Sequence, residues 1–125
     1  MKTQLLIILS ILFLSYISSK AQTVNLPPQE FIAKIKATKD AQLLDVRTPQ
    51  EWEVGRIASS NCNNFNDANF KQNLAKLDKN KPVFVYCAAG GRSSKAAPIL
   101  QEAGFKYVYN LSGGGYKDLA NAGLK

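Results

Sequence analysis

Residues 83 to 93, which read VFVYCAAGGRS, decide the fold of this chain of 125 residues. The first four are consecutive β-forming apolar residues, a pattern typical of a central strand that is buried on both faces of a parallel sheet. Cys87 follows at the carboxyl end of that strand, and a helical pattern resumes at Ser93 and stops at Gly104. A strand, a short loop and a helix in this order are typical of an α/β fold.

The rest of the chain repeats this alternation of apolar runs and amphipathic segments. Helices are expected from Pro28, from Pro49 to Gly55, over 70–77 and after residue 115, and strands are expected at 43–46, at 107–111 and, more weakly, at 61–65. Thr48 and Glu51 form the pattern of a capping box around Pro49. With no repeat or linker after residue 22, residues 22–125 are predicted to form one α/β domain with helices on both faces of its sheet.

The first 21 residues have a different composition. Lys2 precedes a run of 13 mostly apolar residues, 5–17, which is short of the roughly 20 needed to span a bilayer but suits a secretory signal. Ser19 and Ala21 place small residues before a cleavage point at Gln22. We therefore expect residues 1–21 to be a signal peptide and the protein to be exported, periplasmic or secreted. An uncleaved N-terminal anchor is the alternative.

Charge and residue types exclude several classes of function. Without residues 1–21 the chain has 14 basic and 9 acidic residues, a net charge of +5, and its lysines are scattered as on solvated surfaces. Nucleic acid is therefore not an expected partner, although a cationic surface attracts small anions. The chain has no His and two Cys, so neither a zinc site nor a Cys-His pair can form. No metal and no other cofactor is expected.

Cys87 is the candidate nucleophile. Ligands of open α/β sheets bind beyond the carboxyl ends of the strands, where Cys87 lies. The loop after it is made of small residues, which let the backbone curl with its N–H groups inward: Ala88, Ala89, Gly90 and Gly91. Such a nest, with the helix N-terminus and the charge of Arg92, should lower the pKa of the thiol. Ser93 and Ser94 can cap the helix or donate hydrogen bonds to the sulfur. The alternative is an inert buried cysteine.

Residues 45 to 52 are interpreted as structural. Asp45 and Arg47 could act as acid and base, but alternate positions at a strand end more often form hydrogen bonds and ion pairs. Arg47 and Glu51 form a plausible pair across the turn, and Trp52 is expected in the core.

Two further features stay open from the residues alone. Cys62 is either a small buried filler or a resolving thiol that forms a disulfide with Cys87. The glycines 113–115 either form a second tight turn near the site or a simple loop before the last helix.

Four stretches, taken together, resemble the rhodanese-like domain family. They are LLDVRTPQEW at 43–52, GRI at 55–57, YCAAGGRS at 86–93 and GGY at 114–116, and the resemblance covers nearly all of residues 28–124. It implies a five-stranded parallel sheet flanked by helices. It also implies a single-domain sulfurtransferase or persulfide carrier, in which Cys87 takes sulfane sulfur from a donor and passes it to a thiol or cyanide acceptor.

Details of the loop refine this resemblance. Its six residues, 87–92, resemble the sulfur-transferring members, whereas related phosphatases and arsenate reductases have seven. Ala88 stands where many thiosulfate users carry a cation, and Arg56 replaces the common His of the Gly-His-Ile signature, so a protein-bound or small persulfide is an alternative donor to thiosulfate.

A monomer is expected. The competing hypotheses are a noncatalytic module that binds an anion or a partner, and a phosphatase or arsenate reductase.

Overall fold

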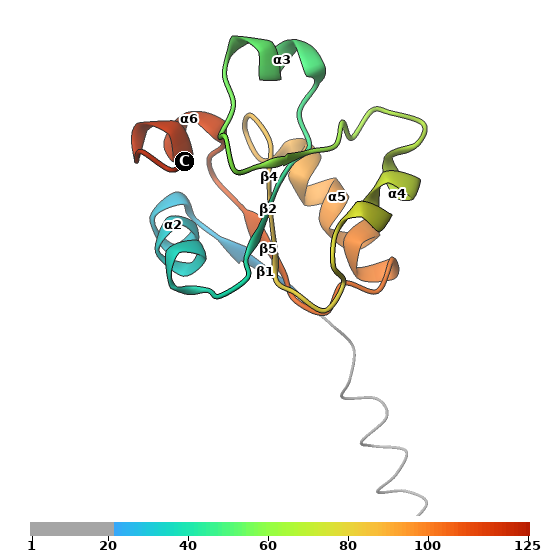
Figure 1. The fold of residues 1–125 in the computed structure, drawn as a ribbon. Helices are drawn as coiled ribbons and strands as arrows, with labels where there is room; N and C mark the ends of the chain where they lie inside the picture. The colour runs from blue at the N-terminus through green and yellow to red at the C-terminus, as the bar shows by residue number, and fades with distance from the viewer. Residues whose placement is uncertain (1–21) are drawn as a thin grey trace, which may run out of the picture.

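Five parallel strands form the sheet expected from the family resemblance (Figure 1). The computed structural model describes residues 22–125, so the expected signal peptide, 1–21, lies outside the described residues. The strands are β1 (Thr23–Leu26), β2 (Gln42–Asp45), β3 (Asn61–Cys62), β4 (Val83–Tyr86) and β5 (Val108–Leu111), in the order β1-β5-β4-β2-β3. Every pairing is parallel.

Helices cover both faces of this sheet, as predicted. They are α2 (Pro28–Ala37), α3 (Pro49–Val54), α4 (Phe70–Asn73) with the 3₁₀ turn η1 (Leu74–Lys76), α5 (Gly91–Glu102) and α6 (Tyr116–Asn121). In Figure 1, α2 and α6 lie on one side of the sheet and α4 and α5 on the other, while α3 lies beyond the end of the sheet. Each face has its own apolar core, one around Phe31 and Phe84 and the other around Leu44 and Leu100.

The strand β4 occupies the centre of the sheet, between β5 and β2. Its four residues are fully buried, because alternate side chains enter opposite cores: Phe84 and Tyr86 the one with α2, Val83 and Val85 the one with α5. Burial of a large apolar side chain contributes about 1.5–3 kcal/mol. This double burial explains the unbroken apolar run and fixes Cys87 at the end of the best-packed strand.

Two local features differ from expectation. The edge strand β1 was not predicted from its own residues, because it is only half-buried and is ordered by pairing with β5. The helix expected over 70–77 is one α-turn followed by a 3₁₀ turn. Within residues 22–125, no helix has the length and apolar character to cross a membrane.

The short helix α3 begins as predicted and packs differently. The Glu51 amide donates to Thr48 Oγ1 (3.4 Å), the Thr48 amide donates to Glu51 Oε1 (3.2 Å), and Pro49 takes the first helical position. Trp52, however, is half-buried, and the expectation that it belongs to the core was wrong. Because α3 lies beyond the strand ends, it has no facing layer to bury a side chain.

Candidate functional site

The loop after β4 wraps around the sulfur of Cys87. Gly90 has φ of 97°, a left-handed conformation that glycine adopts far more readily than other residues, and its amide donates to Cys87 Sγ at 3.0 Å. Gly90 is also the residue before α5, which begins at Gly91. The loop therefore turns backbone donors toward the thiol, as expected for a nest.

The surroundings of Cys87 favour the thiolate. Burial alone raises the pKa of the Cys87 thiol, but hydrogen bonds from the Ser93 amide and hydroxyl and from the Ala89 and Gly90 amides lower it by more. The net pKa of the thiol is below its ordinary value. This lowering agrees with the activation predicted from the small residues of the loop.

Ser93 is the side chain that reaches the sulfur. It is fully buried; its Oγ accepts from the Cys87 thiol at 3.6 Å and donates to the Gly90 carbonyl at 3.2 Å. When the thiol ionises, the hydroxyl can turn its proton from that carbonyl to the sulfur. Ser94 donates to the same carbonyl at 2.6 Å. Neither hydroxyl caps α5, so of the two roles considered for these serines, only the contact between Ser93 and the sulfur is present.

Cys87 is more deeply buried than a residue at a solvent-exposed strand end would be. It is 1% exposed and belongs to the apolar core with Val46 and Ala96, whereas Ala88 and Ala89 are exposed. The cause is the central position of β4, which keeps its next residue between two covered faces. The sulfur is therefore both hydrogen-bonded to amides and shielded from bulk water.

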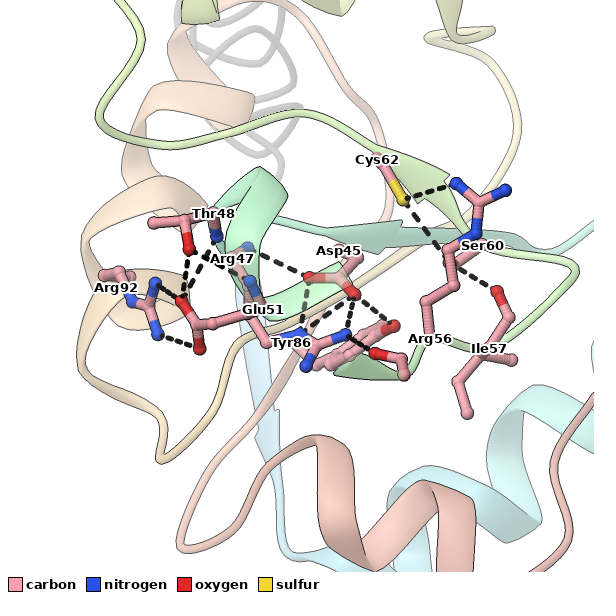
Figure 2. A network of polar contacts seen from close by, with 11 residues as sticks. Asp45, Arg47, Thr48, Glu51, Arg56, Ile57, Ser60, Cys62, Tyr86 and Arg92 are labelled. Atoms are coloured by element: carbon pink, nitrogen blue, oxygen red, sulfur yellow. Dashed lines mark hydrogen bonds and ion pairs between the residues drawn. The ribbon is translucent and has the colours of Figure 1, made fainter. Parts of the chain in front are cut away.

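Arg92 binds a carboxylate on α3. Its Nη1 and Nη2 donate to Glu51 Oε1 (2.6 Å) and Oε2 (3.0 Å), as Figure 2 shows. The hydrogen bond from Arg92 lowers the pKa of Glu51 to about 2, and Glu51, with a smaller effect of Cys87, raises the pKa of Arg92. The predicted pair between Arg47 and Glu51 is therefore wrong, because Arg92 occupies that carboxylate.

Arg47 instead forms a buried pair with Asp45. Arg47 Nη2 donates to Asp45 Oδ2 at 2.8 Å, and the Tyr86 hydroxyl donates to the same oxygen at 2.7 Å (Figure 2). The guanidinium also donates to the Gly55 carbonyl (2.9 Å) and lies 4.0 Å from the ring centre of Tyr116. Asp45 and Arg47 thus join β2, β4, α3 and α6, which confirms their structural interpretation.

The glycines before α6 pack on the loop, as one of the two earlier interpretations expected. The Tyr116 amide donates to the Cys87 carbonyl at 2.9 Å. A methyl group added at Gly115 would lie 2.6 Å from the Cys87 carbonyl oxygen and closer still to the carbonyl of Ala88. Only glycine fits between these backbones, and the run of glycines at 113–115 was the sequence signal for this close approach.

Asn110 was not singled out from the sequence. It is almost fully buried on β5, and its Nδ2 donates to Asn25 Oδ1 (3.0 Å) and to Ser94 Oγ (3.2 Å). Since Ser94 bonds to the carbonyl of Gly90, this chain of contacts ties the loop to β5 and β1. A polar residue inside an apolar strand was the available signal.

The two cysteines are free and are not placed to pair with each other. Cys62 and Tyr86 are both in register with Asp45, on opposite sides of β2. Two strand spacings separate Cys62 from β4 by about 10 Å, beyond the roughly 7 Å limit between Cα atoms of a disulfide. Throughout residues 22–125, no group of His, Cys, Asp and Glu side chains could hold a metal ion.

Known proteins are similar to this chain in sequence and in architecture. A family model described as the rhodanese-like domain matches residues 27–121. The chain is 37% identical over 102 residues to a tRNA uridine(34) hydroxylase of Pelagibacter ubique, covering 81% of this chain and 34% of that one, and 36% identical over 100 residues to the uncharacterized protein YqhL of Bacillus subtilis, covering 80% and 75%. It therefore spans about a third of the length of the hydroxylase.

Solved structures give the same result. The polysulfide-sulfur transferase homodimer of Wolinella succinogenes is 32% identical with a TM-score of 0.62, and the match covers 92% of this chain and 85% of that one. A rhodanese-like domain protein of Staphylococcus aureus is 30% identical with a TM-score of 0.62, covering 72% and 85%. The match of the family model to most of the described residues, on a five-stranded parallel sheet, shows that the chain belongs to the rhodanese-like domain family.

Proposed function

We propose that this protein is a sulfurtransferase that carries sulfane sulfur as a persulfide on Cys87. The observation that carries the proposal is the hydrogen bond of 3.0 Å from the Gly90 amide to Cys87 Sγ, in a loop that lowers the pKa of the thiol. A thiolate is the nucleophilic form of cysteine. Amides that stabilise a negative sulfur in the resting site are also suited to a negatively charged persulfide.

The reaction has two displacements. The Cys87 thiolate attacks a sulfane sulfur of the donor, the donor S–S bond breaks, and its electron pair leaves with the shortened donor, which is sulfite when thiosulfate is used. Cys87 then holds one additional sulfur. A thiol or cyanide attacks this outer sulfur, and the bond to Sγ breaks to return the thiolate. Each step exchanges one bond to sulfur for another and needs no metal.

The site favours a donor that has no sulfonate group. Ala88 leaves the first loop position without a cation, and Arg92 is already bound to Glu51, so no free guanidinium of the loop is available for a sulfonate group. Cys87 is also enclosed. The relative from Wolinella succinogenes is named a polysulfide-sulfur transferase. We therefore propose a polysulfide or a small or protein-bound persulfide as the donor, ahead of thiosulfate.

Export is part of the same proposal and has its own test. The apolar run 5–17 and the small residues Ser19 and Ala21 support cleavage before Gln22. Expression of the whole chain with a C-terminal tag should give a mature protein that begins at Gln22 outside the cytoplasm. A tagged protein that stays in the cytoplasm with residues 1–21 attached would contradict export.

Mass spectrometry of the purified protein tests sulfur transfer. After incubation with polysulfide, and separately with thiosulfate, we expect one added sulfur on Cys87 and its loss when cyanide is supplied. Cys87→Ser should gain none, and Cys62→Ser should behave as the wild type. If Cys87 stays unmodified with both donors, the sulfurtransferase is refuted, and the noncatalytic binding module, which the enclosure of Cys87 favours, becomes the better account.

A further inference from the structure

Two guanidinium groups lie near the carboxyl ends of β2 and β4, and each is bound by a carboxylate. Arg47 pairs with Asp45, and the side chain of Arg47 is 5% exposed while that of Asp45 is fully buried. Arg92 pairs with Glu51, and these two side chains are 26% and 31% exposed. A dissolved anion can therefore compete with Glu51 for Arg92, whereas the pair of Arg47 is almost closed to it.

Arg92 lies in the sequence between two residues that contact the sulfur of Cys87. The Gly90 amide donates to Sγ at 3.0 Å, and Ser93 Oγ lies 3.6 Å from it. The hydrogen bond to Glu51 is the main cause that raises the pKa of Arg92, and the charge of Cys87 raises it further, so the guanidinium and the sulfur interact. A guanidinium binds the oxygens of a carboxylate or a sulfonate through paired N–H groups. An oxyanion that approaches Cys87 would therefore be stabilised by Arg92 if that group were free.

Glu51 does not depend on Arg92 alone for its position. Its Oε1 also accepts from the Thr48 amide at 3.2 Å and from the Thr48 hydroxyl at 3.0 Å, as Figure 2 shows. Both contacts belong to the first turn of α3, where Pro49 restricts the backbone further. The carboxylate that α3 presents to Arg92 is therefore already ordered, and little side-chain freedom is lost when the pair forms.

We propose that Glu51 is a specificity-determining residue that acts through Arg92. By occupying the guanidinium, Glu51 selects against donors whose sulfane sulfur is attached to an oxyanion, such as the sulfonate of thiosulfate, and favours donors without one. The inference rests on the proposed function, since it names the donor class of the same site. The competition between Glu51 and an anion for Arg92 can nevertheless be measured without any transfer of sulfur.

Alkylation of Cys87 by a charged and by an uncharged reagent makes that measurement. Iodoacetate carries a carboxylate and iodoacetamide does not, and each forms a C–S bond to the thiolate with loss of iodide. Because both reagents react with the same thiolate, the ratio of their rates is unaffected by a change in the thiolate fraction. In a Cys62→Ser background, Glu51→Gln should raise the ratio of the iodoacetate rate to the iodoacetamide rate about fivefold, as expected for one charge in partly hydrated surroundings.

Two controls separate the release of Arg92 from a change in structure. Glutamine at position 51 keeps the cap of α3, since its side-chain oxygen accepts from the Thr48 amide as glutamate does, and circular dichroism checks the fold. Glu53→Gln, which removes an exposed carboxylate of the same helix, should leave the ratio nearly unchanged. Methanesulfonate should slow the alkylation of Glu51→Gln in a saturable way, and Arg92→Gln in the same chain should abolish this protection. A purely structural role of Glu51 would change both alkylation rates and leave their ratio as it was.

Persulfide formation, followed by intact mass, extends the test to sulfur donors. Glu51→Gln should raise the rate with thiosulfate, relative to the rate with polysulfide, about fivefold, because the freed guanidinium can bind the sulfonate oxygens. An unchanged alkylation ratio, a raised ratio without protection by methanesulfonate, or an unchanged ratio of the two donors would overturn the inference and leave sulfur transfer at Cys87 intact. If neither donor modifies any variant while the alkylation ratio rises, sulfur transfer is refuted and the control of Arg92 by Glu51 is supported.

Discussion

Replacing Ser93 with alanine should raise the pKa of the Cys87 thiol and slow its alkylation about tenfold at a pH below that pKa. The Ser93 hydroxyl lies 3.6 Å from Sγ and is fully buried, so no water replaces it easily. A hydrogen bond to a charged group contributes about 1.5–3 kcal/mol, and the long contact to sulfur places this one at or just below the lower end. A loss of about 1.4 kcal/mol of thiolate stabilisation lowers the thiolate fraction about tenfold at a pH below the pKa.

The rate of alkylation against pH measures this shift directly. Iodoacetamide reacts with the thiolate, so at a pH below both pKa values Ser93→Ala should react about tenfold more slowly than the wild type, and the two rates should converge at high pH. Both proteins would carry Cys62→Ser, which leaves Cys87 as the reporting thiol. Persulfide formation from polysulfide should slow in the same proportion at neutral pH.

Ser94→Ala is the matched control. Ser94 donates to the same Gly90 carbonyl as Ser93 but has no contact with the sulfur. Its loss should leave the pKa of Cys87 and the rate of its alkylation nearly unchanged. An unchanged pKa in Ser93→Ala, or equal shifts in both variants, would refute the reasoning that the hydroxyl stabilises the thiolate through its own hydrogen bond.

Three further substitutions test the supports of the site. Gly115→Ala forces a methyl group into the carbonyl of Ala88, so denaturant unfolding should show a loss of about 1–3 kcal/mol together with slower persulfide formation. Asp45→Ala leaves Arg47 buried without its partner and should cost about 3–5 kcal/mol in the same assay; a loss below 1 kcal/mol would contradict the network. Since the pKa of Glu51 falls from 4.5 to about 2 on folding, its ion pair adds stability that is complete above pH 4.5 and is lost toward pH 2. Glu51→Gln should therefore unfold more easily at neutral pH and lose less stability over that range, whereas an unchanged pH dependence would argue against the pair.

Local sequence patterns predicted most of the secondary structure. The apolar run at 83–86 predicted the central strand, Thr48 and Glu51 predicted the start of α3, and the small residues after Cys87 predicted amides turned toward its sulfur. All of these depend on residues within a few positions of one another, so the sequence expresses them directly. The edge strand β1 was not predicted, because it is ordered by pairing with β5, which lies more than 80 residues away in the sequence.

Partners distant in the chain were decided by the tertiary structure. Glu51 lies four residues from Arg47 in sequence, yet it binds Arg92, which is 41 positions away. Arg47 instead donates to Asp45, whose carboxylate also accepts a hydrogen bond from the Tyr86 hydroxyl on the neighbouring strand. A carboxylate and a guanidinium within reach of each other in sequence have several possible partners, and packing of α3 over the strand ends selects among them.

The alternating α/β pattern and the cysteine in a loop of small residues could be predicted from the residues alone, because both follow from backbone preferences and short-range hydrogen bonds. The family could be predicted from four short stretches in a fixed order. The burial of Cys87, the packing of Gly115 on its loop and the separation of Cys62 from β4 by two strand spacings emerge from the folded structure. Burial and long-range contact depend on which elements become neighbours, and that is settled when the two faces of the sheet are covered.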